Sequence, residues 1–233
     1  MTESEIRPRS DLGTRTASGV VMMAITGTAI WFGGVVFSLF VLLIAVGLLR
    51  EWQLLIVKIA DNFGARLLWT LGGILYIGTA AAVLAVFRDT GQTDALLAFI
   101  GVVIATDTGA YFAGRTFGGP KIAPHISPSK TWAGLWGGMA ASGLFLLGFA
   151  YASQGQIWPW TLIIGAQLAI VAQAGDFFES WMKRRAGVKD SGNFIPGHGG
   201  LFDRLDGLLP VVIVGALGIL FAEMASGRLV AAS

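Results

Sequence analysis

Residues 20–49 have the sequence VVMMAITGTAIWFGGVVFSLFVLLIAVGLL, which contains no charged side chain. A helix needs about 20 apolar residues to cross a membrane, so this run is too long for one span and short for two. Gly33 and Gly34 lie near its middle, and glycine readily adopts the backbone conformations of a tight turn. We therefore predict a helical hairpin with spans near residues 16–31 and 35–50.

Further uncharged runs along the chain predict additional spans. Of the 233 residues, 55% are hydrophobic and 13% are charged, and the mean hydropathy is +0.71; these values exclude an ordinary soluble protein with buried helices. The 33 glycines suit helices that pack closely in a membrane. The absence of cysteine excludes disulfides and thiolate metal sites. The predicted fold is all-α, a polytopic membrane helix bundle with about seven transmembrane helices (range six to nine), the other spans lying near residues 66–87, 95–113, 132–151, 159–178 and 207–225.

Basic residues gather on one side of this topology. With the N-terminus in the cytoplasm, 14 of the 16 lysines and arginines lie in cytoplasmic segments, and Arg88 and Arg228 lie outside. Cytoplasmic loops of membrane proteins carry an excess of basic residues, so this count supports both the hairpin and the orientation. A single span over residues 20–49 would invert every later loop and scatter the charges.

The polar groups of the chain concentrate in its second half. The inner loops at residues 114–131 and 179–206 hold nearly every side chain able to act on a polar substrate. We therefore expect a site that faces the cytoplasm. Residues 1–94 are expected to form scaffold helices, and residues 95–233 a catalytic transmembrane domain.

Four polar residues near the end of the sixth predicted span share one helix face. Asp176, Glu179, Ser180 and Lys183 are spaced i, i+3, i+4 and i+7, which places them on one side of an α-helix. A carboxylate at this depth is costly unless it is paired or binds a metal, so this face is a candidate functional site. The alternative is a helix end at which water solvates the charges.

A glycine-rich segment, GVKDSGNFIPGHGG at residues 187–200, follows this helix. Five glycines and a proline preclude a regular helix, and backbone N–H groups of such a loop can approach phosphate oxygens. The loop leads to Asp203 and Asp206 at the start of the last span, where the helix dipole favours anions. Carboxylates without cysteine indicate a hard cation such as Mg²⁺, which completes its shell with water and substrate phosphates.

Basic side chains accompany these carboxylates. Lys183, Arg184, Lys189 and Arg204 supply positive charge suited to a polyphosphate. Positive-inside topology alone is the alternative explanation for the basic residues, but it does not explain the interleaved aspartates. Metal ligands, basic groups and a glycine loop at one membrane surface indicate nucleotide chemistry.

A third group precedes these two. Asp107, Tyr111 and Arg115 are spaced i, i+4 and i+8, roughly one stripe of a helix. The segment Ser127-Pro-Ser-Lys130-Thr131 opens the next predicted helix. Hydroxyl groups at a helix start either cap it or hold an anion, and we expect Ser129 to act as a cap.

The twenty-seven residues from Ser180 to Asp206 resemble, without a mismatch, the signature of the phosphatidate cytidylyltransferases (CDP-diacylglycerol synthases). The segments that begin at Asp107 and Ser127 resemble two further conserved segments of that family. The likeness covers roughly residues 107–209 well and the N-terminal half by hydropathy alone. Phe177 departs from the family pattern, because leucine is usual at that position.

The resemblance implies a reaction in which CTP and phosphatidic acid give CDP-diacylglycerol and pyrophosphate. It implies a dependence on Mg²⁺, with a second cation nearby for which K⁺ is a candidate. It also implies a homodimer in the cell inner (plasma) membrane, with CTP, phosphatidic acid and the lipid bilayer as partners and no nucleic acid. His198 would either hold the glycine loop or donate to a phosphate.

Carried over residue by residue, the resemblance implies three sets of functional side chains. The expected catalytic residues are Asp176, Lys183, Asp203, Arg204 and Asp206. The expected metal ligands are Asp176, Glu179, Asp203 and Asp206. The expected substrate-binding residues are Asp107, Tyr111, Arg115, Ser127, Lys130, Thr131, Glu179, Ser180, Arg184, Lys189, Asp190, His198, Gly199 and Gly200.

Three other functions compete with this one. A CDP-alcohol phosphotransferase would need an aspartate motif that the sequence lacks. A CTP-dependent lipid kinase would transfer the terminal phosphate of CTP, and the signature argues against it. A non-enzymatic transporter would distribute polar residues along its spans and show inverted repeats, whereas here the polar residues cluster at one face.

Overall fold

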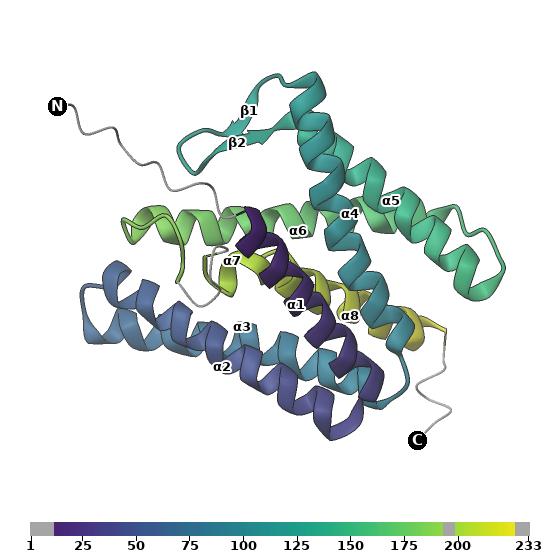
Figure 1. The fold of residues 1–233 in the computed structure, drawn as a ribbon, viewed down its shortest axis with the longest axis horizontal. Helices are drawn as coiled ribbons and strands as arrows, with labels where there is room; N and C mark the ends of the chain where they lie inside the picture. The colour runs from purple at the N-terminus through teal and green to yellow at the C-terminus, as the bar shows by residue number, and fades with distance from the viewer. Residues whose placement is uncertain (1–11, 193–198, 227–233) are drawn as a thin grey trace.

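The computed structural model describes residues 12–192 and 199–226 (Figure 1). Its elements follow in the order α1 (Leu12–Phe32), α2 (Gly34–Ile59), α3 (Phe63–Asp89), α4 (Thr93–Phe117), β1 (Lys121–Ala123), β2 (Ser127–Thr131), α5 (Trp132–Gln154), α6 (Trp160–Arg185), α7 (Phe202–Leu205) and α8 (Leu208–Ala225).

Long apolar helices dominate the structure. Six of them, α2 to α6 and α8, are long and apolar enough to cross a membrane, and α1 contributes a shorter apolar helix at residues 16–32. Among the described residues, the strands β1 and β2 form one small antiparallel hairpin. The prediction of a polytopic, all-α membrane protein is confirmed, and its first predicted span corresponds to α1.

The predicted break between the first two spans lies at Gly33, between α1 and α2. Its φ of 62° and ψ of −157° form a combination that essentially only glycine adopts. Arg88, in the last turn of α3, reaches this break: its Nε donates to the Ile30 carbonyl at 2.7 Å and its Nη2 donates to the Trp31 carbonyl at 3.2 Å. These carbonyls belong to the last turn of α1, where helical partners are lacking, so Arg88 fastens the hairpin to α3.

Small residues let α4, α5 and α6 approach one another closely. A Cβ on Gly109 of α4 would lie 2.5 Å from the Gly137 carbonyl oxygen of α5. A Cβ on Gly165 of α6 would lie 2.6 Å from the Ser142 carbonyl oxygen of α5, and the Ser142 hydroxyl donates to the Gly165 carbonyl at 2.8 Å. Small residues and interhelical hydrogen bonds are the usual means of helix packing in membranes. Helix α5 thus fixes α4 against α6.

The predicted inner loops lie at one end of the bundle. Figure 1 shows the α2–α3 connection and the C-terminal end of α6 at the left, with the β1–β2 hairpin above them. The α3–α4 and α5–α6 connections lie at the other end, on the right. This arrangement brings the polar segments of the second half of the chain into one region.

Two helices extend further than their hydropathy predicts. Helix α2 continues to Ile59 rather than ending near residue 50, and α6 continues to Arg185 rather than ending near residue 178. Trp52, 2% exposed, packs in this region against the rings of Trp69, Phe178 and Phe202, with centroids 5.8–6.1 Å apart. Buried aromatic contacts stabilise these turns although charged residues interrupt the apolar runs.

The prediction that Ser129 caps α5 is wrong. The N-cap is Thr131, whose Oγ1 accepts a hydrogen bond from Gly134 N at 3.0 Å. Ser129 lies within β2, in which Thr131 pairs with Lys121 of β1. A capping oxygen has to come from the residue directly before the first helical turn, and Ser129 lies too early in the chain to reach it.

Replacing Gly33 by alanine should destabilise the protein. The glycine-only backbone conformation would cost about 1–3 kcal/mol, and the new Cβ would also lie within 2.4 Å of the Arg88 guanidinium. Unfolding of the detergent-solubilised protein measures this effect. Gly27→Ala is the matched control, because it lies in helix α1 with no atom within 4 Å of the added Cβ. Equal losses of stability in the two variants would contradict the strained turn.

Candidate active site

The polar stripe predicted on α6 forms in the structure. The Ser180 hydroxyl donates to Asp176 Oδ1 at 3.2 Å, and Lys183 Nζ lies 2.5 Å from Glu179 Oε2. The side chain of Glu179 is only 1% exposed. The alternative of a solvated helix end therefore does not hold for Glu179, which is a buried carboxylate held by a lysine.

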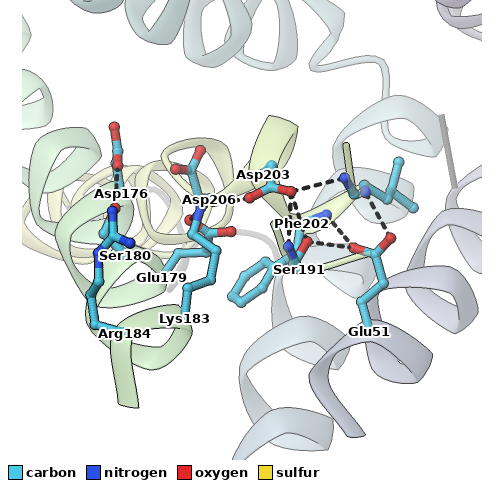
Figure 2. Close-up of polar contacts among 12 residues, drawn as sticks. Glu51, Asp176, Glu179, Ser180, Lys183, Arg184, Ser191, Phe202, Asp203 and Asp206 are labelled. Atoms are coloured by element: carbon cyan, nitrogen blue, oxygen red, sulfur yellow. Dashed lines mark hydrogen bonds and ion pairs between the residues drawn. The ribbon is translucent and has the colours of Figure 1, made fainter. Parts of the chain in front are cut away.

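Asp206, which directly follows α7, adds a third carboxylate to this face (Figure 2). One carboxylate oxygen from each of Asp176, Glu179 and Asp206 lies within 4.8 Å of the other two. Burial and the negative charge of Asp176 raise the pKa of Asp206 to about 7, although a hydrogen bond from Gly207 N lowers it. A cation at this point would favour the ionised form of Asp206.

Asp203 joins the glycine-rich loop to α6. Its Oδ1 accepts from Lys183 Nζ at 2.6 Å, and its Oδ2 accepts from Gly200 N at 2.8 Å and from both Ser191 N and Ser191 Oγ at 3.1 Å. Burial alone would raise the pKa of Asp203, but the hydrogen bonds that it accepts from Lys183 and Gly200, together with the positive charge of Lys183, lower it to about 2. The structure gives Asp203 a role in holding the loop, and its role as a metal ligand stays a prediction.

Lys130 connects β2 to the same face of α6. Its Nζ lies 2.5 Å from Asp176 Oδ2 and donates to Gln173 Oε1 at 2.8 Å. It also lies 4.8 Å from the centroid of the Phe177 ring, a favourable cation–π position. Three contacts with side chains of α6 thus hold the ammonium group of Lys130 at the edge of the cluster of carboxylates.

A cleft of about 360 Å³ opens beside Lys130 and Asp176. Arg115 Nη1 donates to the Tyr111 hydroxyl at 3.0 Å at its wall. A cleft with converging polar side chains is the usual form of a small-molecule site. The residues that line it are Asp107, Ala110, Tyr111, Gly114, Arg115, Ser129, Lys130, Thr131, Gly134, Leu135, Gln173 and Asp176.

The charges of this region fit a divalent cation. The group contains four carboxylates and two ammonium groups, those of Asp176, Glu179, Asp203, Asp206, Lys130 and Lys183. When all are ionised, two negative charges remain, which one divalent cation would offset. Glu179 Oε1 is buried without a hydrogen-bond partner among the described residues, so a ligand atom is available. Oxygen donors of this kind suit Mg²⁺.

Some predicted residues lie away from the cleft lining. Ser127 is buried in β2, and Lys189, Asp190 and Arg204 are exposed. Arg184 donates to the Ile126 carbonyl at 3.2 Å and so links α6 to the β1–β2 hairpin. Gly199 and Gly200 lie at the loop end that contacts Asp203, since a Cβ on Gly199 would lie 3.1 Å from Asp203 Oδ2. His198 lies outside the described residues.

The sequence-based candidates omitted two residues of this region. Gln173 binds Lys130, and an amide one turn before Asp176 on the same stripe could have indicated it. Glu51 of α2 is 3% exposed and binds Ser191 and the start of α7. A carboxylate within a membrane helix indicates a functional group. The predicted span ended at Arg50, however, so Glu51 was placed outside it.

Comparison with known proteins gives consistent matches along the chain. A family model described as "Cytidylyltransferase family" matches residues 58–221. A phosphatidate cytidylyltransferase of Brucella suis biovar 1 (strain 1330) is 36% identical over 92% of this chain and 96% of its own. The enzymes of that name from Rickettsia bellii and Rickettsia typhi are 33% and 31% identical over 87% of this chain, and over 88% and 90% of their own.

Removing the ammonium group of Lys183 should strongly destabilise the protein. Lys183→Ala would leave Glu179 and Asp203 buried without their cation, which costs about 3–5 kcal/mol. Unfolding in detergent with a chelator present measures the loss. Arg184→Ala, which removes an exposed hydrogen bond to a backbone carbonyl, should cost about 1 kcal/mol.

A second substitution tests the cause. Glu179→Gln in the Lys183→Ala background removes one uncompensated charge, so it should recover part of the lost stability. No recovery would show that Lys183 acts by packing rather than by charge.

Proposed function

The chain belongs to the cytidylyltransferase family, and we propose that it transfers the cytidylyl group of CTP to phosphatidic acid, giving CDP-diacylglycerol and pyrophosphate. Relatives named phosphatidate cytidylyltransferase align with most of the chain and over most of their own length. A multi-pass membrane protein suits a reaction between a lipid and a soluble nucleotide.

The observation that carries this proposal is the position of the cleft beside the cluster of three carboxylates. Lys130 lines the cleft and touches Asp176, and Asp176 belongs to the group with Glu179 and Asp206. A triphosphate in the cleft would therefore meet basic side chains on one side and cation ligands on the other. Nucleotidyl transfer requires both, because two anionic substrates must approach each other.

The reaction is a substitution at the α-phosphorus of CTP. A phosphate oxygen of phosphatidic acid forms the new P–O bond, and the bond from the α-phosphorus to the oxygen that bridges to the β-phosphorus breaks, so pyrophosphate leaves. The second pKa of a phosphate monoester is near 6, so the nucleophile is largely ionised at neutral pH. A strong general base is therefore unnecessary, and alignment and charge neutralisation carry the catalysis.

The side chains around the cleft have separate tasks in this reaction. Lys130 and Arg115 bind phosphate oxygens of the substrates, and Tyr111 orients Arg115 through its hydroxyl. Lys183 holds Glu179 and Asp203 in place. Their rigid placement reduces the reorganisation that the transition state would otherwise require.

Mg²⁺ is the cation we assign to Asp176, Glu179 and Asp206, whose oxygens lie within 4.8 Å of one another. When bound, it supplies charge neutralisation at the phosphate oxygens and at the leaving pyrophosphate. K⁺ is the candidate for a second cation near this group.

The orientation and assembly of the protein form part of the proposal. The positive-inside pattern supports an active site at the cytoplasmic face of the inner membrane, where CTP and lipid headgroups meet. The homodimer and the division into a scaffold region and a catalytic region rest on the family resemblance and the sequence pattern.

Labelled CTP should separate this activity from its rivals. With phosphatidic acid and Mg²⁺, the purified protein should transfer the α-phosphate of CTP into a lipid product that migrates as CDP-diacylglycerol on thin-layer plates. Transfer of the γ-phosphate to lipid would instead indicate a kinase. The absence of any covalent lipid product, together with movement of substrate across vesicles, would indicate a transporter.

Asp176→Asn should lower the rate of transfer by about 100-fold or more, because charge stabilisation of a phosphoryl centre is lost. Asp203→Asn should lower it similarly while membrane insertion stays intact, because the loop loses its charged anchor. Asp61→Asn is the control, since Asp61 is an exposed aspartate between α2 and α3 and should retain full activity. Normal turnover of Asp176→Asn at saturating Mg²⁺ would contradict the assigned cation site.

A further inference from the structure

Glu51 is a buried carboxylate in the C-terminal part of α2, away from the cleft lining. Its Oε1 accepts from Leu201 N at 2.9 Å, and its Oε2 accepts from Phe202 N at 2.8 Å and from Ser191 Oγ at 3.0 Å. Figure 2 shows Ser191 and Phe202 between Glu51 and Asp203, with dashed bonds running from this segment to the Glu51 carboxylate. Burying a carboxylate in a membrane helix is costly unless hydrogen bonds compensate it.

We propose that Glu51 is a positioning residue, which fixes the segment from Gly200 to Phe202 and thereby the placement of Asp203 and Asp206. The expected loss of turnover rests on the proposed function. The attachment of the loop to α2 through Glu51, which we call the clamp, does not, because it consists only of hydrogen bonds between the loop and α2.

Both ends of the glycine-rich loop meet at two carboxylates. Ser191, near the beginning of the loop, donates its N–H to Asp203 and places its hydroxyl 3.0 Å from Glu51 and 3.1 Å from Asp203. A hydroxyl carries one proton, so at any moment it donates to one of the two carboxylates. Gly200 N binds Asp203, and the next two amides bind Glu51. The three consecutive N–H groups of Gly200, Leu201 and Phe202 are therefore all satisfied by carboxylate oxygens.

The packing around Glu51 requires small residues in the loop. A Cβ on Gly192 would lie 2.5 Å from Glu51 Oε1, and a Cβ on Gly200 would lie 2.0 Å from Ser191 Oγ and 2.7 Å from Glu51 Oε2. Any larger residue at Gly192 or Gly200 would displace the carboxylate or the serine. These two glycines of the signature thus serve the approach of the loop to Glu51.

The two acceptor oxygens of Glu51 are what this role requires. An ionised carboxylate only accepts hydrogen bonds, on two oxygens, and here both oxygens face N–H or O–H donors. Glutamine has the same shape, but its amide NH₂ would face a backbone N–H and repel it. Asp203 follows Phe202 directly along the chain and Asp206 lies four residues after it, so a displaced Phe202 would move both. A misplacement of about 1 Å can reduce a rate about 100-fold.

The experiment compares Glu51→Gln with Gln53→Ala in the full-length protein. Gln53 lies on the same helix and hydrogen-bonds Thr70 of α3 at 3.0 Å, so its loss weakens α2 without touching the loop. In Glu51→Gln, hydrogen exchange of the Leu201 and Phe202 amides should accelerate about 10- to 100-fold, as expected on losing bonds to a charged acceptor. The kcat should fall about 100-fold, while the KM for CTP changes by less than about threefold, because the residues that line the cleft are untouched.

Gln53→Ala should leave both exchange and kcat near the wild-type values. Wild-type exchange of the two amides in Glu51→Gln would overturn the clamp, and so would an equal loss of kcat in Gln53→Ala. If Glu51→Gln does not insert into the membrane, the same measurements are made on Ser191→Ala. Exchange of the Leu201 and Phe202 amides should then be about tenfold faster than in the wild type. Unchanged exchange in that variant would overturn the proposal. A wild-type protein that makes no CDP-diacylglycerol would refute the proposed function, while the exchange data would still decide the clamp.

Discussion

The ammonium group of Lys183 lies between Glu179 of α6 and Asp203 of α7, and the arrangement of the site depends on this contact. Two buried, ionised carboxylates repel each other strongly in a medium of low dielectric constant, and a positive charge between them offsets this repulsion. Their separation in sequence is large, because the whole glycine-rich loop lies between the two helices. The shared lysine therefore joins the chain before the loop to the chain after it, and leaves Asp176 and Asp206 to meet beside it.

A second requirement is that α4 and β2 reach α6. The close contacts at Gly109 and Gly165 permit this approach, and Lys130 then extends from β2 to Asp176. The cleft is the space left between these elements, with Arg115 and Tyr111 on α4 forming one wall. Interhelical contacts between small residues thus determine where charged side chains from three separate segments meet, although the small residues themselves have no chemical role.

Much of this structure could be predicted from the sequence. Uncharged runs identified the spans, paired glycines identified the break at Gly33, and helical spacing identified the stripe from Asp176 to Lys183. Helix ends were predicted less well, because an uncharged run ends at the first charged residue even where the helix continues. In α2, contacts of Glu51 and Trp52 with distant residues stabilise the turns beyond that point. The capping role of Thr131 instead of Ser129 depended on a short strand that no periodicity revealed. Glu51 was missed because its partners are backbone amides about 150 residues away in the chain.

The family model matches residues 58–221, a segment that begins after Glu51. A fragment trimmed to that segment would retain the whole signature from Ser180 to Asp206, yet the amides of Leu201 and Phe202 would lose their acceptors inside a water-poor interior. The family model therefore covers less of the chain than the site requires, because the support that Glu51 gives to the loop comes from the second helix. The N-terminal boundary of any truncation, fusion or chimaera of this protein should lie before α2, so that the loop keeps its hydrogen bonds to Glu51.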